Sequence, residues 1–144
     1  MSRDKEIIKN LNLLPHPEGG FFKETYRSED STAIFYLLNK NSKSSFHRIK
    51  ADEIWHFYEG KALLVVEILP SGRVQETRLC GTHPQHIVRG GTWFGAYLPE
   101  DSDFALVGCT VAPAFKYEDF EIGKKSELLQ LFPEATSWIE LLNS

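Results

Sequence analysis

The chain has 144 residues, a length that favours a single domain with one hydrophobic core. It carries 16 Lys and Arg against 20 Asp and Glu, which gives a net charge of −4 and a pI near 5.7. This balance argues against a basic surface for nucleic acid or for an anionic membrane. A hydrophobic fraction of 42% with 25% charged residues excludes the disordered and fibrous classes.

Features of exported proteins are missing from the sequence. Residues 1–9 are charged throughout, without the apolar core of a signal peptide. The longest aliphatic run, 62–66, is far shorter than the ~20 residues of a membrane-spanning helix. Cys80 and Cys109 fit no CxxC spacing and suit a reducing compartment. We therefore expect a cytoplasmic protein.

The predicted elements place helices at both ends of a β-rich chain. Ile7 and Leu11 lie at helical spacing before Pro15, which predicts a helix over about 3–13. Apolar stripes on either side of Pro133 predict helices over about 124–143.

Between these helices, hydrophobic residues alternate with a period of two and turn residues recur about every ten positions. The predicted strands are 21–27, 32–38, 45–49, 53–59, 62–69, 74–79, 85–88, 93–97, 105–111 and 115–122. Strands of this number and spacing predict an antiparallel sandwich or barrel.

Strand alternation predicts which side chains share a face. One face of the first strand is expected to carry Phe22, Glu24 and Tyr26. If this face points to the interior, the Glu24 carboxylate lies among apolar side chains. Glu53 and Trp55 share a face of the strand 53–59. A β-bulge would change either assignment.

A histidine, a glutamate and a glycine stand at a recognisable spacing. His47, Glu53 and Gly60 resemble the first signature of the cupin superfamily, with Ile49 in the place of its second histidine. The second cupin signature is matched only at Gly91, because Arg89 replaces its proline and Phe94 its histidine.

A longer series of motifs is more specific than either signature. The motifs are 16–22 (HPEGGFF), 24–28 (ETYRS), 46–48 (FHR), 52–56 (DEIWH), Gln85, 91–94 (GTWF), 107–113 (VGCTVAP) and 118–121 (EDFE). In this order they look like the fifth cupin family, a domain of unknown function described as sugar-epimerase-like. The resemblance covers about residues 11–133.

This resemblance implies an all-β, double-stranded β-helix, the cupin jelly-roll barrel, with short terminal helices. We expect one cupin domain over 1–144, with the jelly roll over about 20–122. The resemblance also implies a homodimer and a ligand pocket in the barrel mouth. Cupins include metal-dependent dioxygenases, isomerases, metal-free sugar epimerases and storage proteins, so the fold leaves the function open.

The metal ligands of a typical cupin are incomplete in this sequence. A catalytic metal usually needs three protein ligands, and the pattern offers only His47 and Glu53, with Gln85 as a poor third. Ile49 and Phe94 cannot coordinate a metal. We therefore expect no cofactor and disfavour a divalent metal, whose ligands would be these three residues.

Metal-free chemistry suits the same residues. Epimerisation beside a carbonyl needs a base and an acid on opposite sides of the substrate. The expected catalytic residues are His47 as base, Glu53 as its orienting partner or as acid, and Tyr26 as the opposing acid. Metal-free cupin epimerases resemble this scheme. A purely structural Tyr26, packed in the core, is the alternative.

Other residues are candidates for binding a ligand. Aromatic walls with a few polar groups are typical of sugar and nucleotide pockets. The candidates are Trp55, Trp93, Gln85, Glu24, His16 and Glu18. His16 and Glu18 either close over the pocket as a lid or merely belong to a turn that Gly19 and Gly20 permit.

The sequence thus predicts a cupin that binds a small polar metabolite, such as a sugar or nucleotide-sugar-like molecule, and acts as a metal-free isomerase or epimerase. The alternatives are a non-catalytic binding or sensing module and a metal-dependent oxygenase with a degenerate site. Residues 99–144 hold nine acids and three bases, whereas 1–98 hold eleven acids and thirteen bases. The predicted pocket residues His47, Glu53, Gln85 and Trp93 lie within residues 1–98, where bases outnumber acids. We therefore expect the pocket to tolerate an anionic sugar phosphate or nucleotide.

Overall fold

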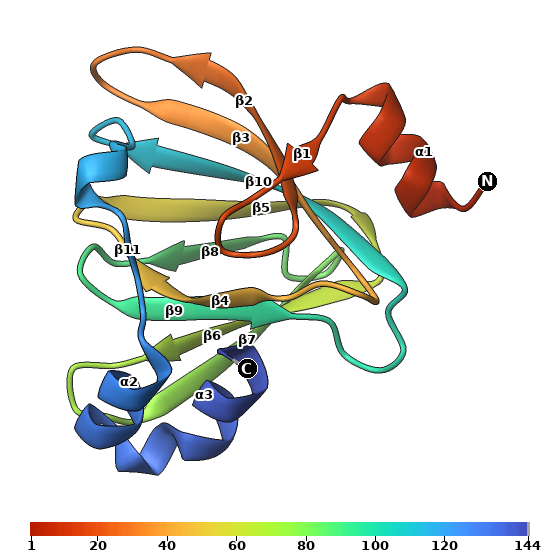
Figure 1. Ribbon diagram of the computed structural model, residues 1–144. Helices are drawn as coiled ribbons and strands as arrows, with labels where there is room; N and C mark the ends of the chain where they lie inside the picture. The colour runs from red at the N-terminus through yellow and green to blue at the C-terminus, as the bar shows by residue number, and fades with distance from the viewer. Residues whose placement is uncertain (144) are drawn as a thin grey trace.

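Two antiparallel β-sheets face each other in the computed structural model, which describes residues 1–143 (Figure 1). One sheet has the strand order β1-β2-β3-β10-β5-β8 and the other β11-β4-β9-β6-β7. The strands are β1 (Leu14–Pro15), β2 (Phe21–Arg27), β3 (Thr32–Asn39), β4 (Ser44–Arg48), β5 (Asp52–Gly60), β6 (Ala62–Ile68), β7 (Val74–Cys80), β8 (Gln85–Val88), β9 (Trp93–Tyr97), β10 (Phe104–Ala112) and β11 (Glu121–Ile122). The predicted fold class is confirmed.

Helices flank the sheets at both ends of the chain. Helix α1 (Arg3–Asn10) precedes β1, and α2 (Lys125–Leu131) and α3 (Thr136–Leu142) follow β11. Pro133 opens a short 3-10 turn between α2 and α3, where its missing N–H costs no hydrogen bond. Within residues 1–143, no helix is long and apolar enough to cross a membrane.

The hydrophobic residues form separate cores on the two faces of the five-stranded sheet. In β6, Leu63 and Val65 point between the sheets, whereas Val66 and Ile68 point toward α2 and α3. This double burial explains why 62–66 is a continuous aliphatic run rather than an alternating one. Figure 1 shows α2 and α3 beside this sheet, away from the space between the two sheets.

The expected strand over 115–122 is wrong for most of its length. Tyr117–Asp119 forms a 3-10 turn, and only Glu121–Ile122 pairs with a neighbouring strand, β4. The amides of Asp119 and Phe120 bond locally to the carbonyls of Lys116 and Tyr117, so they cannot join a sheet. The alternating pattern here reflects aromatic side chains that turn toward the gap between the sheets.

A β-bulge changes the expected face of Tyr26. Glu24 pairs with Ile34 and Tyr26 with Ala33, so the register shifts between them and Thr25 is the extra residue. Glu24 therefore keeps its predicted inward direction, whereas Tyr26 is 56% exposed. In β5 the alternation is unbroken at Glu53 and Trp55, and both are buried as expected.

Candidate functional site

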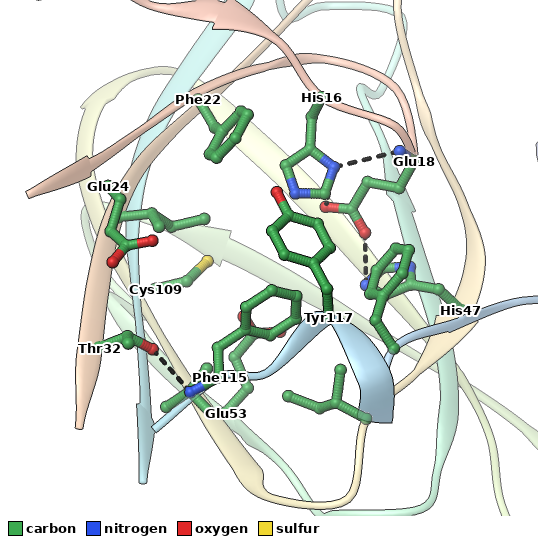
Figure 2. Close-up of a pocket in the computed structure, with 14 residues that line it drawn as sticks. His16, Glu18, Phe22, Glu24, Thr32, His47, Glu53, Cys109, Phe115 and Tyr117 are labelled. Atoms are coloured by element: carbon green, nitrogen blue, oxygen red, sulfur yellow. Dashed lines mark hydrogen bonds and ion pairs between the residues drawn. The ribbon is translucent and has the colours of Figure 1, made fainter. Parts of the chain in front are cut away.

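A pocket lies between the two sheets and opens to solvent. Fourteen residues line it: His16, Glu18, Phe22, Glu24, Thr32, Ile34, His47, Ile49, Glu53, Cys109, Val111, Phe115, Tyr117 and Phe120 (Figure 2). Polar side chains gather at Glu18, His47 and Glu53, and most of the other walls are apolar.

The turn over residues 16–20 carries Glu18 into this pocket. The His16 amide donates to the Gly20 carbonyl, and the Gly19 amide donates to the His16 carbonyl. Gly19 has a φ of 108°, and a Cβ there would lie 1.9 Å from the carbonyl oxygen of Lys43. Glycine is therefore required at this position. The segment is a turn and also contributes two side chains to the pocket.

Glu18 and His47 form a buried ion pair. Glu18 Oε2 lies 2.5 Å from His47 Nε2, and the two side chains are only 7% and 4% exposed. The His47 Nδ1–H donates to the Ser45 carbonyl at 2.7 Å, which fixes the ring with Nε2 toward Glu18.

This pairing shifts the pKa of each partner toward its charged form. Burial by itself would lower the pKa of His47, but the charge and hydrogen bonding of Glu18 outweigh it and raise that pKa. Burial would raise the pKa of Glu18, but the charge and hydrogen bonding of His47, with smaller contributions from His16 and Ser44, together lower that pKa. The pocket thus contains an imidazolium held against a carboxylate.

Of the two histidines that line the pocket, His16 and His47, His16 is uncharged. The Glu18 backbone amide donates to His16 Nδ1 at 3.1 Å, so Nδ1 is an acceptor and the proton lies on Nε2. Burial lowers the pKa of His16; the charge of Glu18 opposes this shift, and the charge of His47 adds to it. His16 Nδ1 lies 3.7 Å from Glu18 Oε1, beyond hydrogen-bond distance.

Glu53 is the second buried carboxyl group of the pocket and behaves differently from Glu18. It lies on β5, is 9% exposed, and receives no ion pair from His47. Burial first, and then the charge of Glu18, raise the pKa of Glu53 to about 8. Glu53 therefore keeps its proton at neutral pH. The expected hydrogen-bonded pair of His47 with Glu53 is replaced by the pair of His47 with Glu18.

Three aromatic residues between β10 and β11 cover the pocket, and we call Phe115, Tyr117 and Phe120 the aromatic cover. Their rings contact one another at centroid distances of 5.0–6.4 Å, and Phe120 also lies 5.6 Å from the His47 ring. The Phe115 amide donates to Thr32 Oγ1 at 3.1 Å, as Figure 2 shows. Sequence reasoning missed this cover because Phe115 and Tyr117 alternate with polar residues as in a strand, although Phe120 breaks that period.

A guanidinium group ties the aromatic cover to β2. Arg27 donates through Nε and Nη2 to the two oxygens of Glu24, at 2.5 and 3.1 Å. Its Nη1 donates to the Phe115 carbonyl at 3.0 Å. Glu24, with a third of its side chain exposed, thus lines the pocket near its opening while already paired to a cation.

The structure brings together five of the sequence candidates and leaves four outside the lining. The five that line the pocket are His16, Glu18, Glu24, His47 and Glu53. Tyr26 is directed away by the bulge in β2. The other three that do not line it are Trp55, Gln85 and Trp93.

Strand geometry explains the positions of those three residues. Trp55 is fully buried between the sheets, where its ring contacts Tyr36. Gln85 lies on the outer face of β8, where its amide contacts His56. Trp93 faces the terminal helices and carries the Arg48 guanidinium 4.4 Å above its ring.

The donor set in the pocket does not fit a divalent metal. Both ring nitrogens of His47 are engaged, by Ser45 and Glu18, and apolar Ile49 lines the wall where a second cupin histidine would stand. Gln85, the expected third ligand, is on the outside of the sheet. Among residues 1–143, no group of three or more His, Cys, Asp and Glu side chains is arranged to hold a metal ion.

Comparisons with known proteins agree with this architecture. The protein SO0799 of Shewanella oneidensis is 35% identical, with a TM-score of 0.92, over 99% of this chain and 98% of that one. The uncharacterised protein YML079W of Saccharomyces cerevisiae is 28% identical over 88% of this chain and 78% of its own length. Streptomyces PAC13, solved with uridine, shares the fold at 10% identity and a TM-score of 0.60, over 78% of this chain and 83% of that one. The family model described as Cupin superfamily (DUF985) matches residues 5–123, and the chain therefore belongs to this cupin family.

Proposed function

We propose that the pocket is a metal-free acid–base site that isomerises or epimerises a small polar molecule beside a carbonyl group. The observation that carries the proposal is a pair of buried carboxyl groups in one pocket, of which Glu18 is ion-paired with His47 and Glu53 is not. Glu18 is held ionised by His47, and burial keeps Glu53 protonated with a pKa of about 8. Two carboxyl groups whose environments separate their pKa values are the usual arrangement of a base and an acid in one site.

The proposed reaction uses these two groups directly. Glu18 accepts the proton from the carbon beside the carbonyl, and Glu53 donates its proton to the carbonyl oxygen, which yields an enediol. In an isomerisation, Glu18 returns its proton to the former carbonyl carbon, and Glu53 recovers its proton from the other hydroxyl of the enediol. In an epimerisation, water on the opposite face protonates the original carbon, Glu53 recovers its proton from the same oxygen, and Glu18 releases its proton to solvent. General acid and base groups of this kind contribute about 10²–10⁴-fold each.

The proposal gives His47 a different role from the base expected on sequence grounds. Its two nitrogens are engaged by Ser45 and Glu18, so it acts on the substrate through Glu18. His47 is therefore a positioning residue that keeps the base ionised and oriented. Tyr26 has no part in the proposed reaction, since it lies outside the pocket.

Distant structural likeness supports a small polar ligand. PAC13, which shares the fold, has been solved with uridine. Uridine combines a flat ring with hydroxyl groups, a combination that matches apolar walls with a few buried polar groups. The hydroxyl-bearing part of such a ligand supports the choice of free sugars for the test.

The test is exchange of carbon-bound hydrogen with solvent. Ribulose, xylulose and fructose are incubated with the protein in D2O, and deuterium entry beside the carbonyl is followed by proton NMR. We expect exchange with at least one ketose, reduced by about 100-fold or more in Glu18→Gln and in Glu53→Gln. Glu121→Gln, which removes an exposed carboxylate outside the pocket, should exchange like the unmodified protein.

Two results would overturn the proposal. One is ketose exchange that persists at full rate in both pocket variants. The other is ligand binding, measured by calorimetry, with no exchange for any ketose that binds, and this second result would identify a binding or sensing module instead.

A further inference from the structure

We propose that the part of the ligand that enters the pocket is an uncharged, hydroxyl-bearing group, and that phosphate and carboxylate groups are rejected. This inference rests on the proposed function and narrows its substrate class to neutral sugars and related polyols. It replaces the expectation, drawn from the charge of residues 1–98, that the pocket tolerates an anion.

The charges that line the pocket support this selectivity. Three of the lining residues are glutamates, and within the described part of the chain none of the fourteen is Lys or Arg. The positive charge of His47 is directed at Glu18 across 2.5 Å. A phosphate placed there would lose water and face the Glu18 carboxylate without a free counter-ion, which is strongly unfavourable in a buried site.

The guanidinium beside the pocket is already neutralised. Arg27 directs Nε and Nη2 to Glu24 and Nη1 to the Phe115 carbonyl. Three of the five guanidinium N–H groups are thereby engaged, and the Glu24 carboxylate already neutralises the charge that an incoming anion would meet. Glu24 therefore acts as a built-in anion that occupies the position a phosphate would otherwise take.

The same pocket offers hydrogen bonds suited to hydroxyl groups. The protonated Glu53 carboxyl can donate, the Glu18 carboxylate can accept, and His16 carries a proton on Nε2. A hydroxyl group both donates and accepts, so it can pair with each of these groups. The apolar walls at Phe22, Ile34 and Val111 fit the C–H face of a sugar ring.

The test uses pairs of ligands that differ only in a phosphate. Binding of ribulose and ribulose 5-phosphate, and of fructose and fructose 6-phosphate, is measured by calorimetry at pH 7. We expect the neutral member of at least one pair to bind at least about tenfold more tightly, a difference of about 1.4 kcal/mol. Tighter or equal binding of the phosphorylated members would overturn the inference, as would binding of no neutral member.

A pair of matched variants tests the assigned role of Glu24. In Glu24→Gln, Arg27 loses its carboxylate partner, so the preference for the neutral ligand should shrink by about threefold or more. Adding Arg27→Gln to that variant should restore the preference. Glu121→Gln frees Arg48 in the same way but outside the pocket, and it should leave the preference unchanged. An unchanged preference in Glu24→Gln would overturn the role of Glu24.

Binding and exchange separate the two proposals. Ketoses that bind with the expected selectivity but do not exchange deuterium would contradict the proposed function alone. If the phosphorylated ketoses bind best and also exchange deuterium, only the inferred preference for uncharged ligands is contradicted.

Discussion

Glu18 Oε2 lies 2.5 Å from His47 Nε2, and both side chains are almost completely buried. One partner comes from a glycine-bounded turn before β2 and the other from β4, so the contact links two distant parts of the chain. Each residue provides the opposite charge that makes burial of the other tolerable. The pair is therefore both a structural link and the source of the ionised carboxylate in the pocket.

Removing one partner of this pair should destabilise the protein. In His47→Gln the Glu18 charge stays buried without a counter-ion, and we expect the free energy of unfolding at pH 7 to fall by about 3–5 kcal/mol. Urea denaturation measures this change. The double variant His47→Gln with Glu18→Gln should recover part of the loss, because it leaves no unpaired charge. A loss below about 1 kcal/mol in His47→Gln would contradict the buried ion pair.

Glu53 should make stability fall as the pH rises. Its pKa is raised from 4.5 to about 8, so the folded protein holds a proton that the unfolded chain releases above pH 4.5. The free energy of unfolding should therefore decrease between pH 4.5 and about 8. Above about pH 8, Glu53 contributes no further change.

The variant Glu53→Gln isolates that effect, because an amide resembles the protonated carboxyl but cannot ionise. The difference in free energy of unfolding, Glu53→Gln minus unmodified protein, should increase steadily from pH 5 to pH 8, by on the order of 2–4 kcal/mol in total. Denaturation curves at several pH values provide the measurement. A difference that does not vary with pH would show that Glu53 titrates alike in the folded and unfolded chains.

The aromatic cover should open more often when its link to β3 is removed. Thr32→Val deletes the acceptor of the Phe115 amide. A hydrogen bond of this kind contributes about 1 kcal/mol, so amide exchange at Phe115 should accelerate about fivefold. The control is Thr25→Val, which removes a threonine hydroxyl bonded to the Ala33 carbonyl instead. Equal exchange at Phe115 in all three proteins would contradict this link.

The donor geometry predicts activity without a bound metal. Protein purified without a histidine tag should contain far less than one equivalent of iron, zinc, manganese or nickel by mass spectrometry. Treatment with a chelator should leave the ketose exchange rate unchanged. One equivalent of metal per chain, together with loss of exchange after chelation, would contradict the acid–base proposal.

Much of the fold followed from local patterns in the sequence. Alternation and turn residues located the main strands, and Pro133 separated the two terminal helical segments as predicted. The segment 115–122 was assigned wrongly, because alternating aromatic residues occur both in strands and in a loop that covers a pocket. Only long-range packing, such as the Phe115 amide on Thr32, distinguishes the two.

The sequence predicts several residues that line the candidate site, but it does not predict which of them contact one another. His47 and Glu53 both line the pocket, but the partner of His47 is Glu18. The sequence spacing of His47 and Glu53 carries a family signature, and it does not determine which carboxylate the imidazole meets in space. Tyr26 was misplaced because a bulge of one residue reverses strand parity and leaves no clear mark in the sequence.

Glu18 and Glu53 should be oppositely protonated at neutral pH. Carbon-13 NMR of the glutamate carboxyl groups as a function of pH measures this, with Glu18→Gln and Glu53→Gln used to assign the signals. We expect Glu53 to titrate near pH 8 and Glu18 below 4.5. Titration of Glu53 near 4.5, or of Glu18 above Glu53, would contradict this expectation.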